Sequence, residues 1–112
     1  MLDHERLDAY QCARKVAALA FQILENVPRG HGELWDQLRR ATISIPLNIA
    51  EGAGKTTARE RARYHAMARG SAMESAAIVD LLRLQALVEP QTASADKALC
   101  VRMVSMLGKM CR

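Results

Sequence analysis

Aromatic residues are scarce in this sequence, making up only 4% of its 112 residues. The sequence also lacks an apolar run approaching the roughly 18 residues that a membrane-spanning helix needs, and no alternation of apolar and polar residues indicates a β-strand. With so few aromatics, a core must be built from aliphatic and small side chains. Alanine, the strongest helix former, is the commonest residue, so we expect an all-α protein whose helices approach one another closely.

Cysteines are few, and Cys12, Cys100 and Cys111 lie too far apart for a disulfide framework or a zinc site. Each falls in an apolar helical pattern, which predicts buried thiols. Residues 1–6 include the ionisable Asp3, His4, Glu5 and Arg6 and lack the apolar segment of a signal peptide. We therefore expect a cytoplasmic protein in a reducing environment, without a membrane segment, metal or cofactor.

Charge of either sign is not strongly in excess, because the formal net charge is +4 and the isoelectric point is about 9.3. Such a balance permits contact with nucleic acid or an acidic partner without requiring it. Half of the residues are hydrophobic and a quarter are charged, which is typical of a packed globule. The length fits a single domain spanning residues 1–112.

Four segments carry apolar residues three and four positions apart, the period of an amphipathic helix. They cover residues 8–26, 33–51, 58–87 and a fourth stretch that begins near Ser94. Pro46 lies inside the second segment, where the apolar period continues on both sides, so we expect a kink and no helix end. Because the connections are short, neighbouring helices should be antiparallel, which predicts an up-down-up-down four-helix bundle.

Local signals indicate where these helices begin. Asp8, with Gln11 three residues later, predicts a cap for the first helix, and Ser94 predicts a cap for the fourth. Thr57 and Glu60 form the pattern of a capping box at the start of the third helix. Glycines at 52 and 54 should end the second helix.

Polar residues recur at helical spacing where the bundle should be apolar. On the second helix they are Gln37, Arg40, Ser44, Asn48 and Glu51. On the third helix the predicted apolar seam of Tyr64, Met67, Ser71, Glu74, Ile78 and Leu81 includes two polar residues. We expect a structural network of Arg40, Ser44, Asn48, Glu51, Ser71 and Glu74, inside the bundle or at a subunit contact, with Arg40 pairing Glu74 or Glu51. A solvent-facing stripe and paired carboxylates for acid–base catalysis or for a metal ion are the alternatives.

Catalytic motifs are incomplete. None of the three histidines follows a glutamate by three residues, as a di-iron bundle requires. Nothing places a histidine near Ser44 or Ser71 for nucleophilic catalysis. The segment 51–56 resembles the end of a phosphate-binding loop, but Ile49 occupies the position of its first glycine and a helix precedes it in place of a strand.

Basic residues gather between positions 53 and 70, a segment that contains five basic residues and one acidic residue. We expect a phosphate-binding surface composed of Arg39, Lys55, Arg59, Arg61, Arg63 and Arg69. Few aromatic side chains accompany them, so base-specific recognition of single strands is not indicated. A solvated basic face is the alternative.

Residues 37–52, QLRRATISIPLNIAEG, and 68–74, ARGSAME, resemble the signature of the four-helix bundle proteins from intervening sequences of large-subunit rRNA genes. The similarity extends over about residues 7–88. It implies an antiparallel bundle that assembles into a ring-like pentamer and has no enzymatic activity. Accessory proteins of diversity-generating retroelements are similar in fold, and in them a basic barrel binds a reverse transcriptase and nucleic acid.

Two functions follow as expectations. The first is a non-enzymatic homo-oligomer, a pentamer, that binds RNA, DNA or a nucleic-acid enzyme such as a reverse transcriptase through its basic surface. The second is a structural or protein-interaction module without nucleic-acid binding. A third hypothesis, an enzyme that uses Glu51 or Glu74, has the least support from the sequence.

Overall fold

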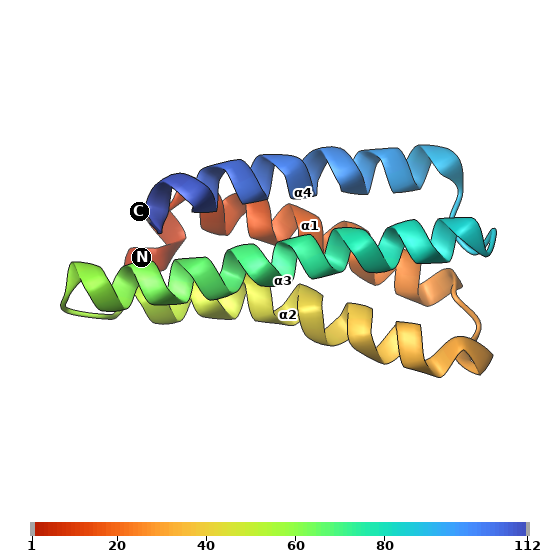
Figure 1. The fold of residues 1–112 in the computed structure, drawn as a ribbon, viewed down its shortest axis with the longest axis horizontal. Coiled ribbons are helices and arrows are strands. Elements are labelled where there is room, and N and C mark those ends of the chain that lie inside the picture. The colour runs from red at the N-terminus through yellow and green to blue at the C-terminus, as the bar shows by residue number, and fades with distance from the viewer. Residues whose placement is uncertain (1, 112) are drawn as a thin grey trace.

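Four long helices packed side by side make up the protein (Figure 1), in a computed structural model that describes residues 2–111. The helices are α1 (Asp8–Asn26), α2 (Gly32–Ala53), α3 (Ala58–Leu84) and α4 (Pro90–Met110). A short 3-10 helix, η1 (Asp3–Arg6), precedes α1, and a second, η2 (Arg29–His31), leads into α2. Successive helices run in opposite directions (Figure 1). The predicted all-α, antiparallel four-helix bundle is confirmed.

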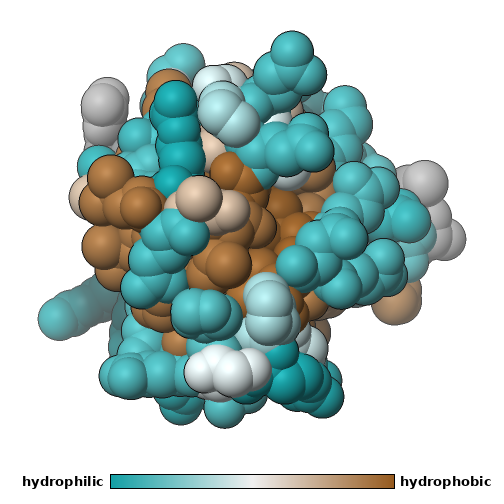
Figure 2. All heavy atoms as spheres, turned by 90° about the vertical axis from the view of Figure 1, so that its right-hand side faces the viewer, coloured by the Kyte–Doolittle hydropathy of each residue, from teal (hydrophilic) through white to brown (hydrophobic). Residues whose placement is uncertain are grey.

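Each long helix packs against the helices before and after it, and α4 closes the bundle by packing against α1. The bundle measures 44 by 24 by 22 Å. The two chain ends and the α2–α3 connection lie at one end, and the α1–α2 and α3–α4 connections lie at the other (Figure 1). Viewed onto that second end, apolar side chains gather in a hollow surrounded by polar ones (Figure 2). The core is therefore only partly covered there.

The helix α1 has the predicted bounds but not the predicted cap. Leu7 occupies the N-cap position and makes no side-chain hydrogen bond, and Asp8 is the first helical residue. The expectation that Asp8 caps α1 is wrong. Its carboxylate still lies in the first turn, where negative charge suits the exposed amides of a helix.

The helix α2 continues through Pro46, as predicted. Ile45 and Ile49, on either side of the proline, are both fully buried. Their packing against the core holds together a helix that has lost one backbone hydrogen bond at Pro46. The helix ends at Ala53, and Gly54 follows it in a right-handed conformation.

Thr57 caps the start of α3. Its hydroxyl oxygen accepts a hydrogen bond of 3.1 Å from the backbone amide of Glu60, and the hydroxyl lies 3.3 Å from a carboxylate oxygen of the same residue. The first half of the predicted capping box is confirmed. The second half of a capping box is a hydrogen bond from the Thr57 backbone amide to the Glu60 carboxylate. Here the Thr57 hydroxyl contacts that carboxylate instead.

The C-terminus of α3 lies three residues before the predicted one, because the chain reverses at Ala86. This alanine has a φ of 58°, in the left-handed region. The backbone amides of Ala86 and Leu87 donate to the carbonyls of Arg83 and Leu82, each over 2.9 Å. These two bonds define a Schellman motif, whose left-handed position is usually glycine. Because the sequence has alanine and not glycine at position 86, this helix end was not predicted.

The helix α4 begins at Pro90, not at Ser94. Proline suits the first turn of a helix because the amide it lacks would have no partner there. Ser94 lies inside α4 and is exposed. The predicted cap at Ser94 is therefore wrong, and Glu89 occupies the N-cap position.

The core-facing side of α3 is also not the predicted one. Its buried residues are His65, Ala68, Ala72, Ser75, Ile78, Val79 and Leu82. Of the predicted seam only Ile78 is buried, whereas Met67, Glu74 and Leu81 are exposed. The small residues Ala68, Ala72 and Ser75 face the core, where they let neighbouring helices approach, whereas Met67, Met73, Leu81 and Leu84 are exposed. Hydrophobicity alone does not reveal this arrangement.

Candidate functional site

Ser44, Asn48 and Ser71 form the centre of the polar contact between α2 and α3. The hydroxyl oxygens of Ser44 and Ser71 lie 2.8 Å apart. The side-chain amide of Asn48 donates to the Ser44 hydroxyl over 2.8 Å and to the Ser44 carbonyl over 2.9 Å. All three residues are half-buried. The structure thus brings together three of the six residues predicted to form a polar network.

Arg40 and Glu74 lie at the surface beside this contact. Together with Gln37, Ala41, Ser44 and Ser71 they line a shallow groove of about 280 Å³. Both charged residues are exposed, and among residues 2–111 neither makes an ion pair. The expectation of an Arg40–Glu74 pair inside the bundle is therefore wrong for the single chain.

Glu51 belongs to a different neighbourhood. It is exposed, and its carboxylate lies 3.6 Å from the ammonium of Lys55, one turn further along the chain. The expected Arg40–Glu51 pair is absent from the described residues. The contact between Ser44 and Ser71 sets the antiparallel register, which places Glu51 and Glu74 about 15 Å apart along the bundle at 1.5 Å per residue. The two carboxylates cannot act on one substrate atom within a chain.

The six predicted phosphate-binding residues divide into two groups. Three of them make contacts within the protein: Lys55 pairs with Glu51 and lies over the ring of Tyr64, Arg61 donates to the Lys55 carbonyl over 3.2 Å, and half-buried Arg69 lies against Gly108 of α4. The other three, Arg39, Arg59 and Arg63, are exposed and make no ion pair with another described residue.

Arg59 and Arg63 are one turn apart on the outward face of α3. Arg39 lies elsewhere, because the register between α2 and α3 places it near residue 76 of α3, about 20 Å along the bundle from Arg63. The expectation that Arg39 lies near the basic stretch is wrong. The exposed basic site is therefore the beginning of α3, at the end of the bundle that also carries the chain termini (Figure 1).

The sequence-based prediction missed a buried carboxyl group. Asp96 on α4 is 1% exposed, and the thiol of Cys100 lies 3.8 Å from its Oδ2. Burial is the main cause that raises the pKa of Asp96 to about 6. Burial, together with the nearby carboxylate, raises the pKa of the Cys100 thiol to about 12. The signal was present in the sequence, because Asp96 continues the spacing of Ala93, Cys100 and Met103.

The cysteines are mostly inaccessible, as predicted. Cys12 and Cys100 are buried and Cys111 is half-buried. Burial also raises the pKa of Cys12. Since the thiolate is the reactive form, the two buried cysteines are poor nucleophiles and poor metal ligands. Within residues 2–111 no three side chains of the metal-binding types gather in one place.

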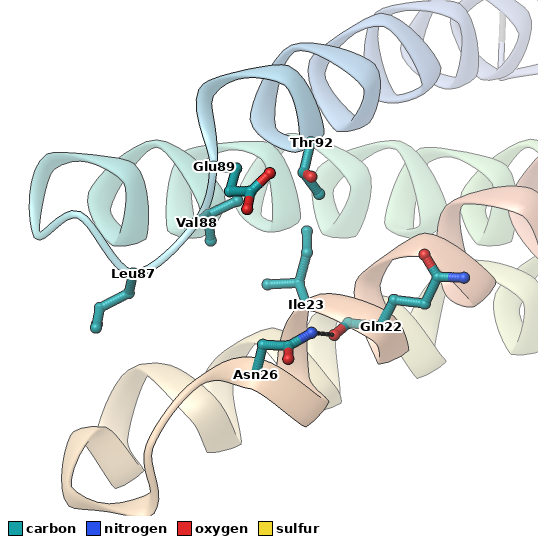
Figure 3. A pocket seen from close by; sticks show the side chains of 7 residues that line it. All are labelled: Gln22, Ile23, Asn26, Leu87, Val88, Glu89 and Thr92. Atoms are coloured by element: carbon teal, nitrogen blue, oxygen red, sulfur yellow. Dashed lines mark hydrogen bonds between the residues drawn. The ribbon is translucent and has the colours of Figure 1, made fainter.

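A cavity of about 420 Å³ lies at the bundle end that is far from the basic site, between the end of α1 and the α3–α4 connection (Figure 3). Ile23, Leu87 and Val88 supply its apolar lining, and Gln22, Asn26, Glu89 and Thr92 its polar rim. The side-chain amide of Asn26 donates to the Gln22 carbonyl of its own helix over 2.9 Å. Glu89 is the only charged residue in the lining.

No described helix is both long and apolar enough to cross a lipid bilayer. No curated protein matches the chain. The model of one protein family does match it, over residues 5–109. This range contains all four helices almost completely, together with both sequence motifs and the Ser44–Ser71 contact. The chain belongs to the family of the 23S rRNA-intervening sequence proteins.

Proposed function

We propose that this protein is a non-enzymatic subunit of a homo-oligomer, a pentamer, that binds nucleic acid through the exposed basic residues at the start of α3. The observation that carries the proposal is a stripe on the outward face of α3, opposite its core-facing side. The stripe consists of Arg59, Arg63, Ala66, Gly70, Met73, Ala77, Leu81 and Leu84, all exposed. Its first two members are basic and its remaining members are apolar or small.

The basic part of the stripe supports binding to phosphates. Arg59 and Arg63 lie one turn apart on the same face, exposed and without an acidic partner among the described residues. Arginine recognises phosphate oxygens with its planar fork of donors. Tyr64 is half-buried beneath Lys55, so it is not free to stack on a base. We therefore expect binding to the phosphate backbone with little sequence preference.

The apolar part of the stripe supports assembly. Leu84 is 82% exposed and Met73 52% exposed on a helix whose opposite face is already packed. On α1, by contrast, Val16 and Ile23 are buried inside the single chain and are not available to another subunit. In a ring, each subunit would contribute one basic site, and several weak contacts would act together.

The test is fluorescence anisotropy with labelled single-stranded and double-stranded RNA and DNA between about 50 and 200 mM salt. Log affinity should fall linearly with log salt concentration. In the Arg59→Glu, Arg63→Glu variant the affinity should drop and the slope should decrease by about 2, one for each lost phosphate contact.

The matched control is the Arg14→Glu, Arg83→Glu variant, which changes the net charge equally at two exposed arginines of α1 and the end of α3. It should retain most of the binding. Equal losses in both double variants would show that only net charge matters. If no oligonucleotide binds at low salt, the chain is better explained as a protein-interaction module, whose partner could be a nucleic-acid enzyme such as a reverse transcriptase.

A further inference from the structure

The groove between α3 and α4 is lined mainly by apolar and small side chains. Its volume is about 330 Å³, and its lining consists of Met73, Ala76, Ala77, Asp80, Cys100, Val101 and Val104. Met73 and Val101 are 52% and 61% exposed. Met73 and Ala77 also belong to the outward stripe of α3, so the groove and the apolar part of the stripe form one continuous surface. A large apolar surface on a folded chain is typical of an interaction site.

A ring of five identical subunits needs a second, different surface on each chain, because every contact joins unlike sides of two neighbouring copies. Outside α3 and its groove, the large apolar residues that are exposed are Leu2, Phe21 and Leu47. On the long helices Leu47 is the more exposed of these, at 62% compared with 42% for Phe21. Because it is two residues from the fully buried Ile45 and Ile49, Leu47 lies on the outward side of α2.

Two charged residues flank Leu47 on the same face of α2. Arg40 precedes it by seven residues and Glu51 follows it by four, which is the spacing of residues that share one face of a helix. Arg40 is exposed and makes no ion pair with another described residue. Glu51 is exposed and contacts only Lys55 of its own chain, over 3.6 Å. Both charges are therefore accessible to another copy.

The groove side of α3 carries the complementary pattern. Arg69 precedes Met73 by four residues and Asp80 follows it by seven, so these three residues also share one face. Arg69 is half-buried against Gly108 of α4. Asp80 contacts Lys97 over 3.1 Å, and its side chain is 53% exposed. On each helix one charge thus lies about 6 Å from the central apolar residue and the other about 10 Å, at 1.5 Å per residue.

We propose that the outward face of α2 of one copy docks along the α3–α4 groove of the next copy, with Leu47 against Met73. Copies that stand side by side in a ring point in the same direction, so α2 of one copy runs antiparallel to α3 of its neighbour. The flanking residues then form pairs of opposite sign, Arg40 with Asp80 and Glu51 with Arg69. Such complementarity fixes the register of a contact. The contact presupposes the proposed homo-oligomer and specifies which surfaces join its subunits.

This register leaves the basic site uncovered. The helix α2 ends at Ala53, which lies opposite residue 67 of α3 in the neighbouring copy. Half-buried Ile43, one turn from Leu47, lies opposite the exposed Ala77 and adds a second apolar pair. The docked helix therefore covers the apolar part of the outward stripe. Arg59 and Arg63 lie beyond its end and stay free to bind phosphates in the assembly.

Disulfide cross-linking tests the contact directly. In a Cys111→Ser background, the Leu47→Cys, Met73→Cys variant should form a covalent ladder of up to five chains under mild oxidation, whereas a mixture of the two single variants should form covalent dimers only. The matched control is Leu47→Cys with Glu74→Cys. Glu74 is also exposed but lies about 100° further around α3 than Met73, so this variant should cross-link far less.

A charge exchange tests the register. Arg40→Glu and Asp80→Arg should each lower the mass measured by light scattering, because each variant places like charges opposite one another. The two changes in one chain should restore the mass. Arg40→Glu combined with Glu74→Arg is the matched control and should not restore it.

The outcomes separate this contact from the proposed function. A wild type that is monomeric at every concentration would overturn both the homo-oligomer and the contact. An oligomer in which the Leu47→Cys, Met73→Cys variant does not cross-link, or in which the charge exchange restores nothing, would overturn the contact alone. More efficient cross-linking of Met73→Cys with Phe21→Cys would also overturn it and would assign the second surface to α1.

Discussion

Gly52 of α2 lies directly against His65 of α3. A Cβ atom at position 52 would lie 3.1 Å from the His65 Nε2 and equally close to the Cβ of Tyr64. Both Gly52 and His65 are buried, and the His65 Nδ1 lies 3.5 Å from the carbonyl of Met110. The ring is therefore held between the ends of α2 and α4, and the absence of a side chain at position 52 lets α2 and α3 meet there.

We expect Gly52→Ala to lower the free energy of unfolding by about 1–2 kcal/mol, because the cost of overpacking exceeds the gain in helix propensity. Gly70 is the matched control, since it lies in the middle of α3 and a Cβ there would meet nothing within 4 Å. Gly70→Ala should raise stability by about 0.5–1 kcal/mol. Urea unfolding measures both variants. A stabilised Gly52→Ala variant would show that His65 moves away easily.

Ala86 is expected to be a site where glycine stabilises the protein. Its φ of 58° strains a residue that carries a Cβ, and the two hydrogen bonds of the α3 C-terminus require this conformation. We expect Ala86→Gly to add about 0.5–1 kcal/mol to the free energy of unfolding. Ala95→Gly, at an exposed position inside α4, makes the same chemical change and should cost about 1 kcal/mol. Thermal and urea unfolding should therefore shift in opposite directions for the two variants.

The architecture could be predicted from the sequence because the apolar period on α1 and α2 is long and regular. Asp8–Asn26 was predicted to the residue, and Pro46 was correctly placed inside α2. The orientation of α3 could not be predicted, because its two faces are similarly apolar. Its core-facing stripe mixes the small Ala68, Ala72 and Ser75 with Ile78, Val79 and Leu82, and its outward stripe contains Met73, Leu81 and Leu84. A search for large hydrophobic residues therefore selects the wrong face.

Only part of the candidate site could be predicted, namely the part that depends on spacing within a single helix. Ser44 and Asn48 depend only on the spacing within α2, and the structure places them in the expected polar contact with Ser71. Placing Arg40, Glu74 and Arg39 required the rotation of α3 and its register against α2, which no pattern within one helix contains. Asp96 was not predicted as a core residue because an aspartate in an amphipathic helix is normally expected on the solvent-facing side.

Asp96 should make the protein more stable in mild acid. Burial raises its pKa from 3.8 to about 6 in the folded state, so the folded chain binds a proton more tightly than the unfolded chain does. Its contribution to stability is complete below pH 3.8 and is lost as the pH rises through about 6. A shift of this size corresponds to about 2–3 kcal/mol.

The measurement is the urea midpoint of the wild type and of Asp96→Asn between pH 4 and pH 8. As the pH is lowered from 7 to 5, the wild type should gain stability relative to Asp96→Asn. Asp36→Asn, which changes an exposed carboxyl of α2, controls for the loss of one negative charge and should still show the gain. Parallel curves for the wild type and Asp96→Asn would mean that Asp96 is solvated in the folded protein.

Thr57 should matter more to the stability of the chain than Glu74. Thr57 accepts a hydrogen bond from the first turn of α3, and Thr57→Ala should cost about 1 kcal/mol. Glu74 is exposed and has no ion-pair partner among residues 2–111, so Glu74→Ala should change stability by less than about 0.5 kcal/mol. Urea midpoints compare the two. If Glu74→Ala has a large effect that grows with protein concentration, then Glu74 lies in a contact between subunits.

Assembly should depend on the apolar part of the outward stripe of α3. Its three large apolar side chains, Met73, Leu81 and Leu84, are 52%, 49% and 82% exposed. Met67, which lies beside the stripe, is 46% exposed. Single exposed leucines are common on protein surfaces, but a continuous apolar stripe of this kind is typical of an interaction site.

In size-exclusion chromatography with light scattering at micromolar concentration, the wild type should have a mass near five times 12.4 kDa. Leu81→Glu with Leu84→Glu should reduce it, because charged side chains would be buried without partners. Ala18→Glu, at an exposed position of α1, adds a charge without removing a large apolar side chain and should assemble normally. If the wild type elutes as a monomer at every concentration, the stripe does not mediate self-assembly and is better explained as a binding surface for a different protein.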